Sequence, residues 1–331
     1  MTIALKLKTL SLAVAVAALG IAAPASAQTV MKLGWTTSDG AKDPYAIGAR
    51  AFKDEVEKRT GGKIEVQLYP NRQLGDEKDM VEGMRFGTID AGIITNAVVA
   101  NVAPAFQLND LPFLFSSEEQ AHKVLDGDIG QRLVKDLESK GLYVLGFMEG
   151  GFRNMINNVR PVVEPKDVGG VKYRVMQNPV YIDMFSSLGG SAVPMAWGET
   201  FTAVQQGTID GLEIPVAVIS SNKYNEVTKF LSLTNHTYSV IELLVSKRNF
   251  DRLPADQQKA VREAAKAATA AQRQAAFANV KELLADLESK GMKVNKIKDP
   301  AAFRASVKPV YDKFRRPIGA DLMDAALKAV E

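Results

Sequence analysis

The sequence predicts an α/β protein with two domains and a long helix that spans both. Segments with the periodicity of strands alternate with segments with the periodicity of helices, which is typical of βαβ units and a largely parallel sheet. The chain has 331 residues, more than a single hydrophobic core usually supports. Near the C-terminus, the stretch Ala255–Lys290 contains neither Gly nor Pro, which favours one long helix.

The first half of the chain shows the clearest alternation of strands and helices. Asp43 and Pro44 have the residue types of an N-cap and a first helical position, and Gly61-Gly62 ends the helix that they begin. Apolar residues occupy every second position of Lys63–Tyr69, as expected of a strand. The further predicted elements are the strand Val30–Leu33, the helix Asp76–Phe86 and the strand Ala91–Ile94.

A second series of strands and helices is predicted to start near Phe147. Its elements are the strand Lys172–Met176, the helix Tyr181–Leu188 and the helix Glu199–Gln206. The hexapeptide Asp-Leu-Glu-Ser-Lys-Gly occurs at both Asp136–Gly141 and Asp286–Gly291, and strand-like residues follow each copy. We interpret the two copies as one way of ending a helix, used twice, and not as a repeat fold.

The stretch Ala255–Lys290 lies between Pro254 and Gly291, residues that favour the start and the end of a helix. An unbroken helix of this length would reach ~54 Å, which is longer than one domain is wide. Its Ala-rich, charged composition suits a helix along the outside of two domains, either continuous or kinked in the middle. A coiled coil is not indicated, because the stretch has no seam of Leu or Ile.

The N-terminus has the features of a secretory signal peptide. Lys6 and Lys8 are basic, the run from Leu10 to about Ala23 is apolar, and Ala25-Ser26-Ala27 matches a cleavage site. The apolar run is shorter than the ~20 residues needed to span a bilayer. Cleavage after Ala27 would leave 304 of the 331 residues as a mature protein in the periplasm. Because the chain has no Cys for lipid attachment, we expect this mature protein to be soluble.

Composition excludes several classes of function. Basic and acidic residues nearly balance, 41 against 38, and no basic stripe indicates binding to nucleic acid. Thiol catalysis is excluded by the absence of Cys, and the two His leave little for a zinc site. His122 follows a predicted capping box, Ser116-x-x-Glu119, and is expected on an exposed helix face, whereas His236 is expected where a strand begins. No nucleotide-binding or hydrolase motif is present, so we expect no cofactor and no metal.

Two arginines stand out among the charged residues. Arg153 follows a predicted strand in the sequence Gly-Gly-Phe-Arg-Asn, and Arg174 lies inside the strand Lys172–Met176. Residues at alternate positions of a strand share one face, so Arg174 lies on the same face as Lys172 and Met176. This pattern leaves open whether the Arg174 guanidinium lies on an exposed face or over a cleft.

Motifs along nearly the whole mature chain resemble those of the extracytoplasmic solute receptors of TRAP (tripartite ATP-independent periplasmic) transporters. Each motif is short, but their order behind a signal peptide is specific. The matching segments are Gly62–Pro70, Gln73–Gly75, Gly87–Asp90, Asp110–Phe115, Gly151–Asn154, Lys172–Val175, Val193–Met195 and Gln205–Glu213. The predicted long helix also matches, since members of that family have a helix that runs across both domains.

The resemblance implies a two-domain periplasmic binding protein fold, with the ligand cleft between the domains and a long helix spanning both. Domain I would comprise residues 28–151 and about 240–279, and domain II residues 152–239 and about 280–331. The ligand carboxylate would be bound by Arg174, with help from Arg153. A guanidinium suits this task because its planar fork can donate two parallel hydrogen bonds to one carboxylate.

Other candidate binding residues are carried over from the family by position. They are Trp197, Gln177, Asn178, Thr36, Thr95, Asn96, Glu213 and Ile214. Trp197 is expected to cover the ligand, and Glu213 to support an arginine from behind. The three candidates of the first domain end strands, where open α/β sheets place ligands. Many relatives carry Asn where this chain has Ile214, so the edge of the pocket should be more apolar here.

The resemblance narrows the ligand to a small organic acid. Sialate is not expected, because Thr95 and Val98 replace charged residues that sialate-binding relatives use. A four-carbon dicarboxylate, a sugar acid, a keto acid and an aromatic acid remain, and the amides of Gln177 and Asn178 favour a hydroxylated acid. The family further implies a monomer that closes about a hinge and delivers its ligand to TRAP membrane permease subunits driven by an ion gradient.

Two other functions remain open at this point. A periplasmic enzyme acting on a small carboxylic acid would need a base such as Glu213 or Asp183, although the sequence shows no nucleophile–base pair. A binding protein that serves a sensor kinase or an ATP-driven importer would have the same general fold.

Overall fold

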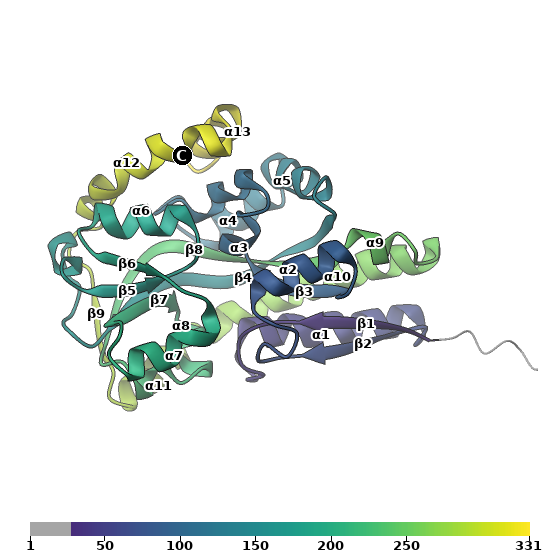
Figure 1. Cartoon of the computed structure of the whole chain (residues 1–331), viewed down its shortest axis with the longest axis horizontal. Helices are drawn as coiled ribbons and strands as arrows, with labels where there is room; N and C mark the ends of the chain where they lie inside the picture. Colours follow the sequence, from purple (N-terminus) through teal and green to yellow (C-terminus); the bar gives the residue numbers. More distant parts are fainter. Residues whose placement is uncertain (1–27) are drawn as a thin grey trace, which may run out of the picture.

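The computed structural model describes residues 28–331, which form one mixed sheet with helices on both faces (Figure 1). The predicted signal peptide and its cleavage site lie outside these residues. The strands follow the order β2-β1-β3-β8-β4-β7-β5-β6, and β9 pairs with β8. The sheet therefore continues from the N-terminal strands to the strands of the second series without a break.

One edge of the sheet is built by the N-terminal elements. They are β1 (Thr29–Gly34), α1 (Pro44–Thr60), β2 (Ile64–Tyr69), α2 (Glu77–Phe86) and β3 (Ala91–Thr95), with β1 parallel to both β2 and β3. Asp43 caps α1 by accepting hydrogen bonds from the backbone N–H groups of Tyr45 and Ala46. Gly61 ends α1 in the left-handed conformation, with φ of 59°. The predicted elements of this half are thus confirmed.

The other edge repeats this arrangement with the second series. It comprises β5 (Lys172–Val175), α6 (Pro179–Ser187), β6 (Ser191–Pro194), α7 (Trp197–Gln205), β7 (Gly211–Pro215) and α8 (Val216–Ser221). β5 is parallel to both of its neighbours, β6 and β7. The predicted strand and both predicted helices are present, and their ends differ from the prediction by at most 2 residues.

Two long strands join the two edges. β4 (Leu142–Asn157) has 16 residues, β8 (Phe230–Ser246) has 17, and the two pair antiparallel over most of their length. At ~3.4 Å per residue such a strand reaches across ~50 Å. The prediction of a new series starting near Phe147 was wrong, because Phe147 lies inside β4. Glycines such as Gly151, with φ of 96°, do not end the strand but accompany register shifts, as β-bulges do.

The remaining elements cover the sheet. They are α3 (Asn96–Val99), α4 (Glu118–Leu125), α5 (Asp128–Glu138), α9 (Lys247–Phe250), α10 (Ala255–Ala278), α11 (Val280–Ser289), β9 (Lys293–Lys296), α12 (Pro300–Ile318), α13 (Ala320–Ala329) and short 3₁₀ helices at Pro104–Asp110, Pro165–Val168 and Tyr224–Glu226. Figure 1 shows α12 and α13, in yellow, outside α6 and α5.

The predicted long helix is present but breaks at Asn279 into α10 and α11. α10 packs against α1 and β4, whereas α11 packs against α8. Small residues let α1 and α10 approach closely: a Cβ added to Gly48 would lie 3.3 Å from Cγ of Gln272 on α10. Each segment follows the surface beneath it, so the break occurs where the helix passes from one half of the sheet to the other.

The hydrophobic core divides between the two faces of the sheet. Along β8, Tyr238, Val240 and Leu244 belong to one cluster, which also contains residues of α2, α5, α6 and α12. Ile241 and Leu243 belong to the other cluster, which also contains residues of α1, α8, α10 and α11. Because successive side chains of a strand point to opposite faces, β8 contributes to both.

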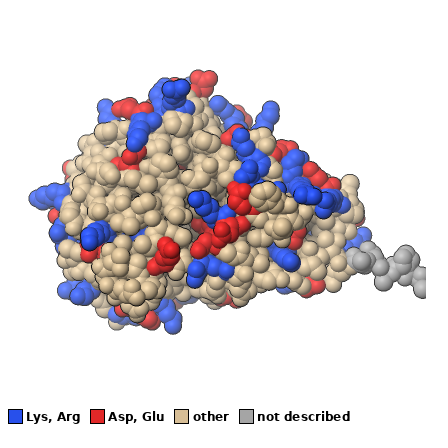
Figure 2. Space-filling view, viewed as in Figure 1, with Lys and Arg blue, Asp and Glu red and all other residues tan. Residues whose placement is uncertain are grey.

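The helices and the surface charge of residues 28–331 can be described together. Within residues 28–331, no helix is both long enough and apolar enough to cross a bilayer. Figure 2 shows basic and acidic side chains interspersed over the visible face, which matches the near balance of charge in the sequence.

The first turn of α4 differs from the prediction. Its N-cap is Ser117, whose Oγ accepts a hydrogen bond of 3.2 Å from the Gln120 N–H, so the capping box predicted at Ser116 and Glu119 was wrong. His122 is half-buried and not exposed, because Nε2 lies 3.1 Å from Glu149 Oε2 in β4.

The repeated hexapeptide ends a helix in both places, as predicted. Gly141 and Gly291 follow α5 and α11 with φ of 89° and 95°, and a Cβ added to either would have no other atom within 4 Å.

Replacing Gly141 or Gly291 with Ala should lower the free energy of unfolding by ~1–3 kcal/mol, because only the backbone conformation penalises a side chain there. Urea titration measures the change. The exposed Ser139→Ala and Ser289→Ala variants should stay within ~0.5 kcal/mol of the wild type, and equal stability of Gly and Ser variants would contradict the argument.

Candidate ligand-binding site

A small cavity lies where the two halves of the sheet meet. Its walls come from the ends of strands and the first turns of helices in both halves. The lining residues are Thr36, Thr37, Tyr45, Glu77, Thr95, Arg153, Arg174, Met176, Trp197, Ile214, Pro215 and Val218. Strand ends at such a junction are the usual place for ligands in open α/β sheets.

Arg174 is the dominant charge of the cavity. It lies on β5 with only 2% of its surface exposed, which decides the question that the sequence left open in favour of a cleft. Nε donates to the carbonyl oxygen of Met195 at 2.9 Å, and Nη1 lies 3.3 Å from Sδ of Met176. Among residues 28–331, no carboxylate forms an ion pair with this guanidinium. Burial lowers the pKa of Arg174, but a guanidinium stays charged in proteins. The site therefore holds a buried guanidinium that has no ion-pair partner among the described residues.

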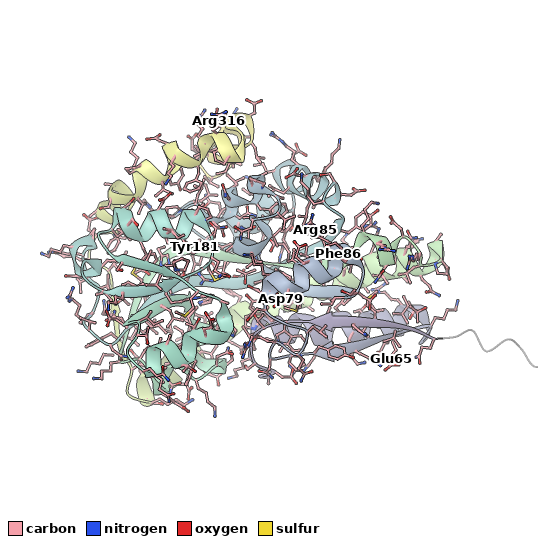
Figure 3. The ribbon with its side chains drawn as sticks, viewed as in Figure 1. Glu65, Asp79, Arg85, Phe86, Tyr181 and Arg316 are labelled. Atoms are coloured by element: carbon pink, nitrogen blue, oxygen red, sulfur yellow. The ribbon has the colours of Figure 1, made fainter. Side chains whose placement is uncertain are left out.

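Arg153 has a different environment. It lies inside β4, not after a strand as predicted, and it is bound by Glu213 of β7. Nε donates to Glu213 Oε2, Nη2 donates to Oε1 at 2.8 Å and to the Glu213 carbonyl oxygen at 2.6 Å, and Nη1 donates to Ser239 Oγ at 3.3 Å. The Arg153 guanidinium also lies 5.4 Å from the ring of Tyr181 on α6. Figure 3 labels Tyr181. One hydrogen of Nη1 is left for a ligand.

Glu213 supports Arg153 from behind, and His236 supports Glu213. Burial alone would raise the pKa of Glu213, but Arg153 and His236 outweigh it and hold the pKa below its usual value. His236 Nε2 lies 3.2 Å from Glu213 Oε2, and Nδ1 lies 2.8 Å from Thr234 Oγ1. His236 lies well inside β8 and not at its start, and burial lowers its pKa. These side chains form a buried network that fixes the position of Arg153.

Glu77 is a lining residue that the sequence analysis missed. Its Oε1 accepts hydrogen bonds of 2.8 Å from both the N–H and the hydroxyl of Thr95, and Tyr45 OH lies 2.7 Å from the same hydroxyl. Burial raises the pKa of Glu77, although the bonds from Thr95 oppose this. Glu77 is the first residue of α2, a position where an acidic side chain is usually exposed and stabilises the helix terminus. Only its burial distinguishes it, and the sequence does not show burial.

The predicted residues fall into three groups. Arg174, Arg153, Trp197, Thr36, Thr95 and Ile214 line the cavity, and the Trp197 ring centroid lies 5.9 Å from Cζ of Arg174. Gln177 lines an adjoining groove that shares Arg174, Glu77 and Trp197 with the cavity. Asn96, Asn178 and Glu213 do not line either space.

The amides of Asn96 and Asn178 are used by the protein itself, which differs from the expectation that they face the ligand. Asn178 caps α6: its Oδ1 accepts from Val180 N–H at 2.8 Å, and its Nδ2 donates to Ala97 O and to Asp110 Oδ2. Asn96 Nδ2 donates to the carbonyl oxygen of Phe106 at 2.9 Å. Both side chains are buried and hold loops beneath the site.

The two halves of the molecule meet around the cavity. Ser38 N–H donates to Asn222 Oδ1 at 3.0 Å, and Ser221 Oγ donates to Asp43 Oδ2 at 2.7 Å. On another side, the Asn101 amide donates to the carbonyl oxygen of Gln177 at 3.0 Å. The cavity is thus bounded by contacts between segments far apart in the sequence.

The two carboxylates considered as possible bases, Glu213 and Asp183, are both engaged in ion pairs. The Glu213 carboxylate is occupied by Arg153, and Asp183 pairs with Lys313 and does not line the cavity. Within residues 28–331, no group of His, Asp and Glu could hold a metal ion. What the cavity offers is a buried cation among hydrogen-bonding and apolar side chains, which is suited to binding an anion.

Comparison with known proteins identifies the family. A model of bacterial extracellular solute-binding proteins, family 7, matches residues 36–317. The chain belongs to this family. A solute-binding protein of Verminephrobacter eiseniae is 41% identical over 90% of this chain and 88% of its own length. The 2,3-diketo-L-gulonate-binding periplasmic protein YiaO of Escherichia coli is 35% identical over 97% of this chain and 98% of its own.

Solved structures of family 7 proteins have the same fold. A TRAP periplasmic solute-binding protein from Polaromonas, bound to D-erythronate, is 39% identical, with a TM-score of 0.87 over 90% of this chain and 98% of its own. A TRAP periplasmic solute-binding protein from Sulfurospirillum deleyianum, with bound succinate, is 29% identical to this chain. Its TM-score is 0.87, and the match covers 92% of this chain and 100% of its own. The resemblance to TRAP receptors and the two-domain fold class are confirmed. Members of family 7 are transport proteins that bind solutes and not enzymes, so the enzymatic alternative is set aside.

Asp110 lies beneath the site, where Asn178 donates to its carboxylate, and burial raises its pKa to about 7. The unfolded value is ~3.9, so the folded protein holds a proton that the unfolded chain releases. This contribution to stability is complete below pH ~4 and is lost as the pH rises towards ~7.

Asp110→Asn cannot release a proton, so between pH 5 and 7 its stability should rise relative to the wild type by up to ~1.4 kcal/mol per pH unit. Urea unfolding across this range tests the trend. Asp54→Asn, at an exposed position of α1, should show no such trend, and a flat difference for Asp110→Asn would contradict the assignment.

Proposed function

We propose that this protein captures a small hydroxylated monocarboxylic acid, such as a sugar acid, and delivers it to a TRAP permease. The observation that carries this proposal is the buried Arg174 guanidinium, which lines a cavity and has no carboxylate partner among the described residues. A buried cation is costly unless it is paired. A ligand carboxylate would provide the missing charge and take two hydrogen bonds from the planar fork.

The two arginines would then divide their roles. Arg174 has free donors and would form the main bond to the ligand carboxylate. Arg153, held by Glu213 and Ser239, would add one hydrogen bond from Nη1 and contribute its fixed positive charge. Each charge-assisted hydrogen bond contributes ~1.5–3 kcal/mol net. Trp197 would cover the carboxylate where its ring lies against Arg174.

The rest of the cavity favours hydroxyl groups over a second carboxylate. Glu77 presents a buried carboxyl group to the cavity, which can accept hydrogen bonds from hydroxyls but repels another anion. The hydroxyl of Thr36 lines the cavity and could bind a ligand hydroxyl, whereas Ile214 provides an apolar wall. The similar proteins whose ligands are sugar-derived acids support this class, although one similar structure holds succinate.

Capture would proceed by closure of two domains about a hinge. We assign residues 28–151 and about 240–279 to domain I, and residues 152–239 and about 280–331 to domain II. The hinge would comprise the bulged middle parts of β4 and β8 together with the break at Asn279. A ligand that contacts both domains stabilises the closed form and so selects it.

The location and the partners follow from family membership. Family 7 proteins are periplasmic or extracytoplasmic. We propose export of this chain by the signal peptide, cleavage after Ala27, and docking of the closed monomer on the permease subunits of a TRAP transporter. Thermal-shift screening of residues 28–331 against sugar acids and dicarboxylates tests the proposal. Sugar acids should raise the melting temperature, because a ligand that binds the folded state stabilises it.

Replacing Arg174 should abolish binding without unfolding the protein. We expect Arg174→Met to weaken sugar-acid affinity at least ~100-fold, because a loss of ~3 kcal/mol or more accompanies removal of a buried charge partner. Calorimetric titration with D-erythronate and D-galactonate measures the change. The matched control is Lys172→Met, an exposed position on the same strand, which should bind normally. If Arg174→Met loses stability in the absence of acid and binds as the wild type does, Arg174 has a structural role only.

Replacing Glu77 should change selectivity. Glu77→Gln keeps an oxygen for the N–H of Thr95 but removes the charge, so a second ligand carboxylate meets less repulsion. We expect the affinity ratio of succinate to D-erythronate to rise about tenfold, a change of ~1.4 kcal/mol. The control is Glu82→Gln on the solvent side of α2, paired with Arg85, which should leave the ratio unchanged. An unchanged ratio in both variants would show that Glu77 does not select against dicarboxylates.

A further inference from the structure

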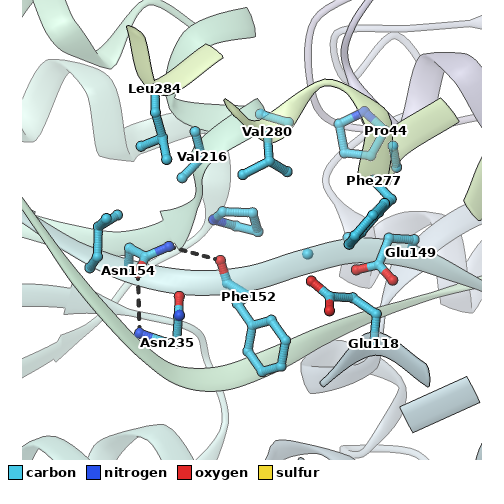
Figure 4. Close-up of a pocket in the computed structure, with 16 residues that line it drawn as sticks. Pro44, Glu118, Glu149, Phe152, Asn154, Val216, Asn235, Phe277, Val280 and Leu284 are labelled. Carbon is cyan, nitrogen blue, oxygen red and sulfur yellow. Dashed lines mark hydrogen bonds between the residues drawn. The ribbon is translucent and has the colours of Figure 1, made fainter. Parts of the chain in front are cut away.

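We propose that a second site, a groove that adjoins the acid cavity beside β4, binds an organic cation with an apolar body. The groove and its lining residues are drawn in Figure 4. Phe152 and Asn154 line it, whereas Arg153 between them lines the acid cavity. Successive side chains of a strand point to opposite faces, so β4 gives different side chains to the two spaces, which adjoin at Pro215. We call this second site the rear groove.

One end of the rear groove is acidic. Glu118, at the start of α4, and Glu149, on β4, both line it, and Figure 4 shows their carboxyl groups at the same end. Burial raises the pKa of Glu118, and the charge of Glu149 adds to this effect, which indicates that the two groups are close. The guanidinium of Arg273 does not neutralise this end, because Asp126 binds it through two hydrogen bonds of 2.6 and 2.9 Å.

Glu149 has an unused hydrogen-bond acceptor at this end. Only 2% of the residue is exposed, and its Oε2 is bound by the Tyr238 hydroxyl and lies 3.1 Å from His122 Nε2. Its Oε1 is buried and has no hydrogen-bond partner among the described residues. Oε1 is directed towards Gly151, which also lines the groove: a Cβ added to Gly151 would lie 3.9 Å from it. A buried carboxylate oxygen without a donor is a costly arrangement that a cationic N–H group would relieve.

The wall of the rear groove that α10 and α11 form is apolar and unusually exposed. Phe277 is 59% exposed and Val280 36%, and these residues flank Asn279, where α10 gives way to α11. They are two of the few large hydrophobic residues that are exposed in residues 28–331. Val216 and Leu284 extend the apolar wall on the side of α8 and α11. Exposed apolar groups that meet in a groove are typical of binding sites.

The acidic part and the apolar wall of the rear groove together indicate which class of ligand it would bind. A primary ammonium would bind the carboxylates of Glu118 and Glu149, and an attached aromatic or aliphatic body would pack on Phe152, Phe277 and Val280. The rings can also attract the cation through its charge. An organic acid would be repelled, so the rear groove would not take the ligand that Arg174 binds. The walls come from both predicted domains, so occupancy should also favour one hinge angle, a consequence that rests on the closure proposed above.

Calorimetry with benzylamine tests the proposal, with benzoate and benzyl alcohol as probes of equal shape and different charge. We expect saturable binding of benzylamine at the rear groove and none of benzoate there. Phe277→Ala and Glu118→Gln should each weaken benzylamine binding about five- to tenfold. Glu118→Gln is the charge test of choice, because Glu149 also supports Tyr238 and His122.

Two controls separate this site from the acid cavity. Phe86→Ala removes an equally exposed ring, 68% accessible, at the C-terminal end of α2 (Figure 3) and should leave benzylamine binding unchanged. Arg174→Met should lose D-erythronate binding but keep benzylamine binding, so the two proposals can fail separately. Absence of saturable benzylamine binding, equal weakening by Phe277→Ala and Phe86→Ala, or loss of benzylamine binding in Arg174→Met would each overturn the rear-groove assignment.

Discussion

The guanidinium groups of Arg153 and Arg174 are both buried in this molecule, but only Arg153 pairs with the buried carboxylate of Glu213. The site depends on the guanidinium that is left without an ion pair. Glu213 binds Arg153 through both oxygens, and its charge reaches Arg174 only at a distance. Burying a charge is tolerated where a partner stands beside it, and Arg153 has that partner. Arg174 does not. Among residues 28–331, Arg174 thus has no ion-pair partner, and a ligand anion would provide one under the function proposed above.

The layers behind the cavity keep this arrangement rigid. His236 orients Glu213, Asn178 fixes the start of α6, and Asp110 accepts a hydrogen bond from Asn178. These side chains are buried and hydrogen-bonded to one another, so they define positions without touching a ligand. Buried polar networks of this kind cost little when every member is satisfied and much when one is removed. The arginines can therefore be held in place before a ligand arrives, which reduces the ordering that binding requires.

The long strands β4 and β8 explain how two sites can lie so close together. Arg153 of β4 lines the acid cavity, Phe152 of β4 lines the rear groove, and Pro215 of β7 lines both. The bulges in the β4–β8 pairing fall in this same middle part. Bulges interrupt the ladder and increase local twist. The stretch of sheet that joins the two halves is therefore also its least regular part, as a hinge requires.

The sequence by itself was enough to predict most of the short helices and strands, to recognise the family, and to select Arg153 and Arg174 as candidate site residues. Strand alternation, the cap at Asp43 and the glycines that end helices are local signals, so the short elements of both halves and the twice-used hexapeptide were predictable. Family membership followed from the order of short motifs. Only the tertiary structure decided which polar residues face the cavity. Asn96 and Asn178 were expected there but bond to backbone atoms, whereas Glu77 was not expected and lines it. The sequence also did not show that β4 is one continuous strand, because its glycines suggest that the strand ends. In the structure, β4 continues through these glycines, and the pairing with β8 shifts register there, as at β-bulges. Burial and long-range hydrogen bonding arise from segments far apart in the chain, and no local pattern of residues records them.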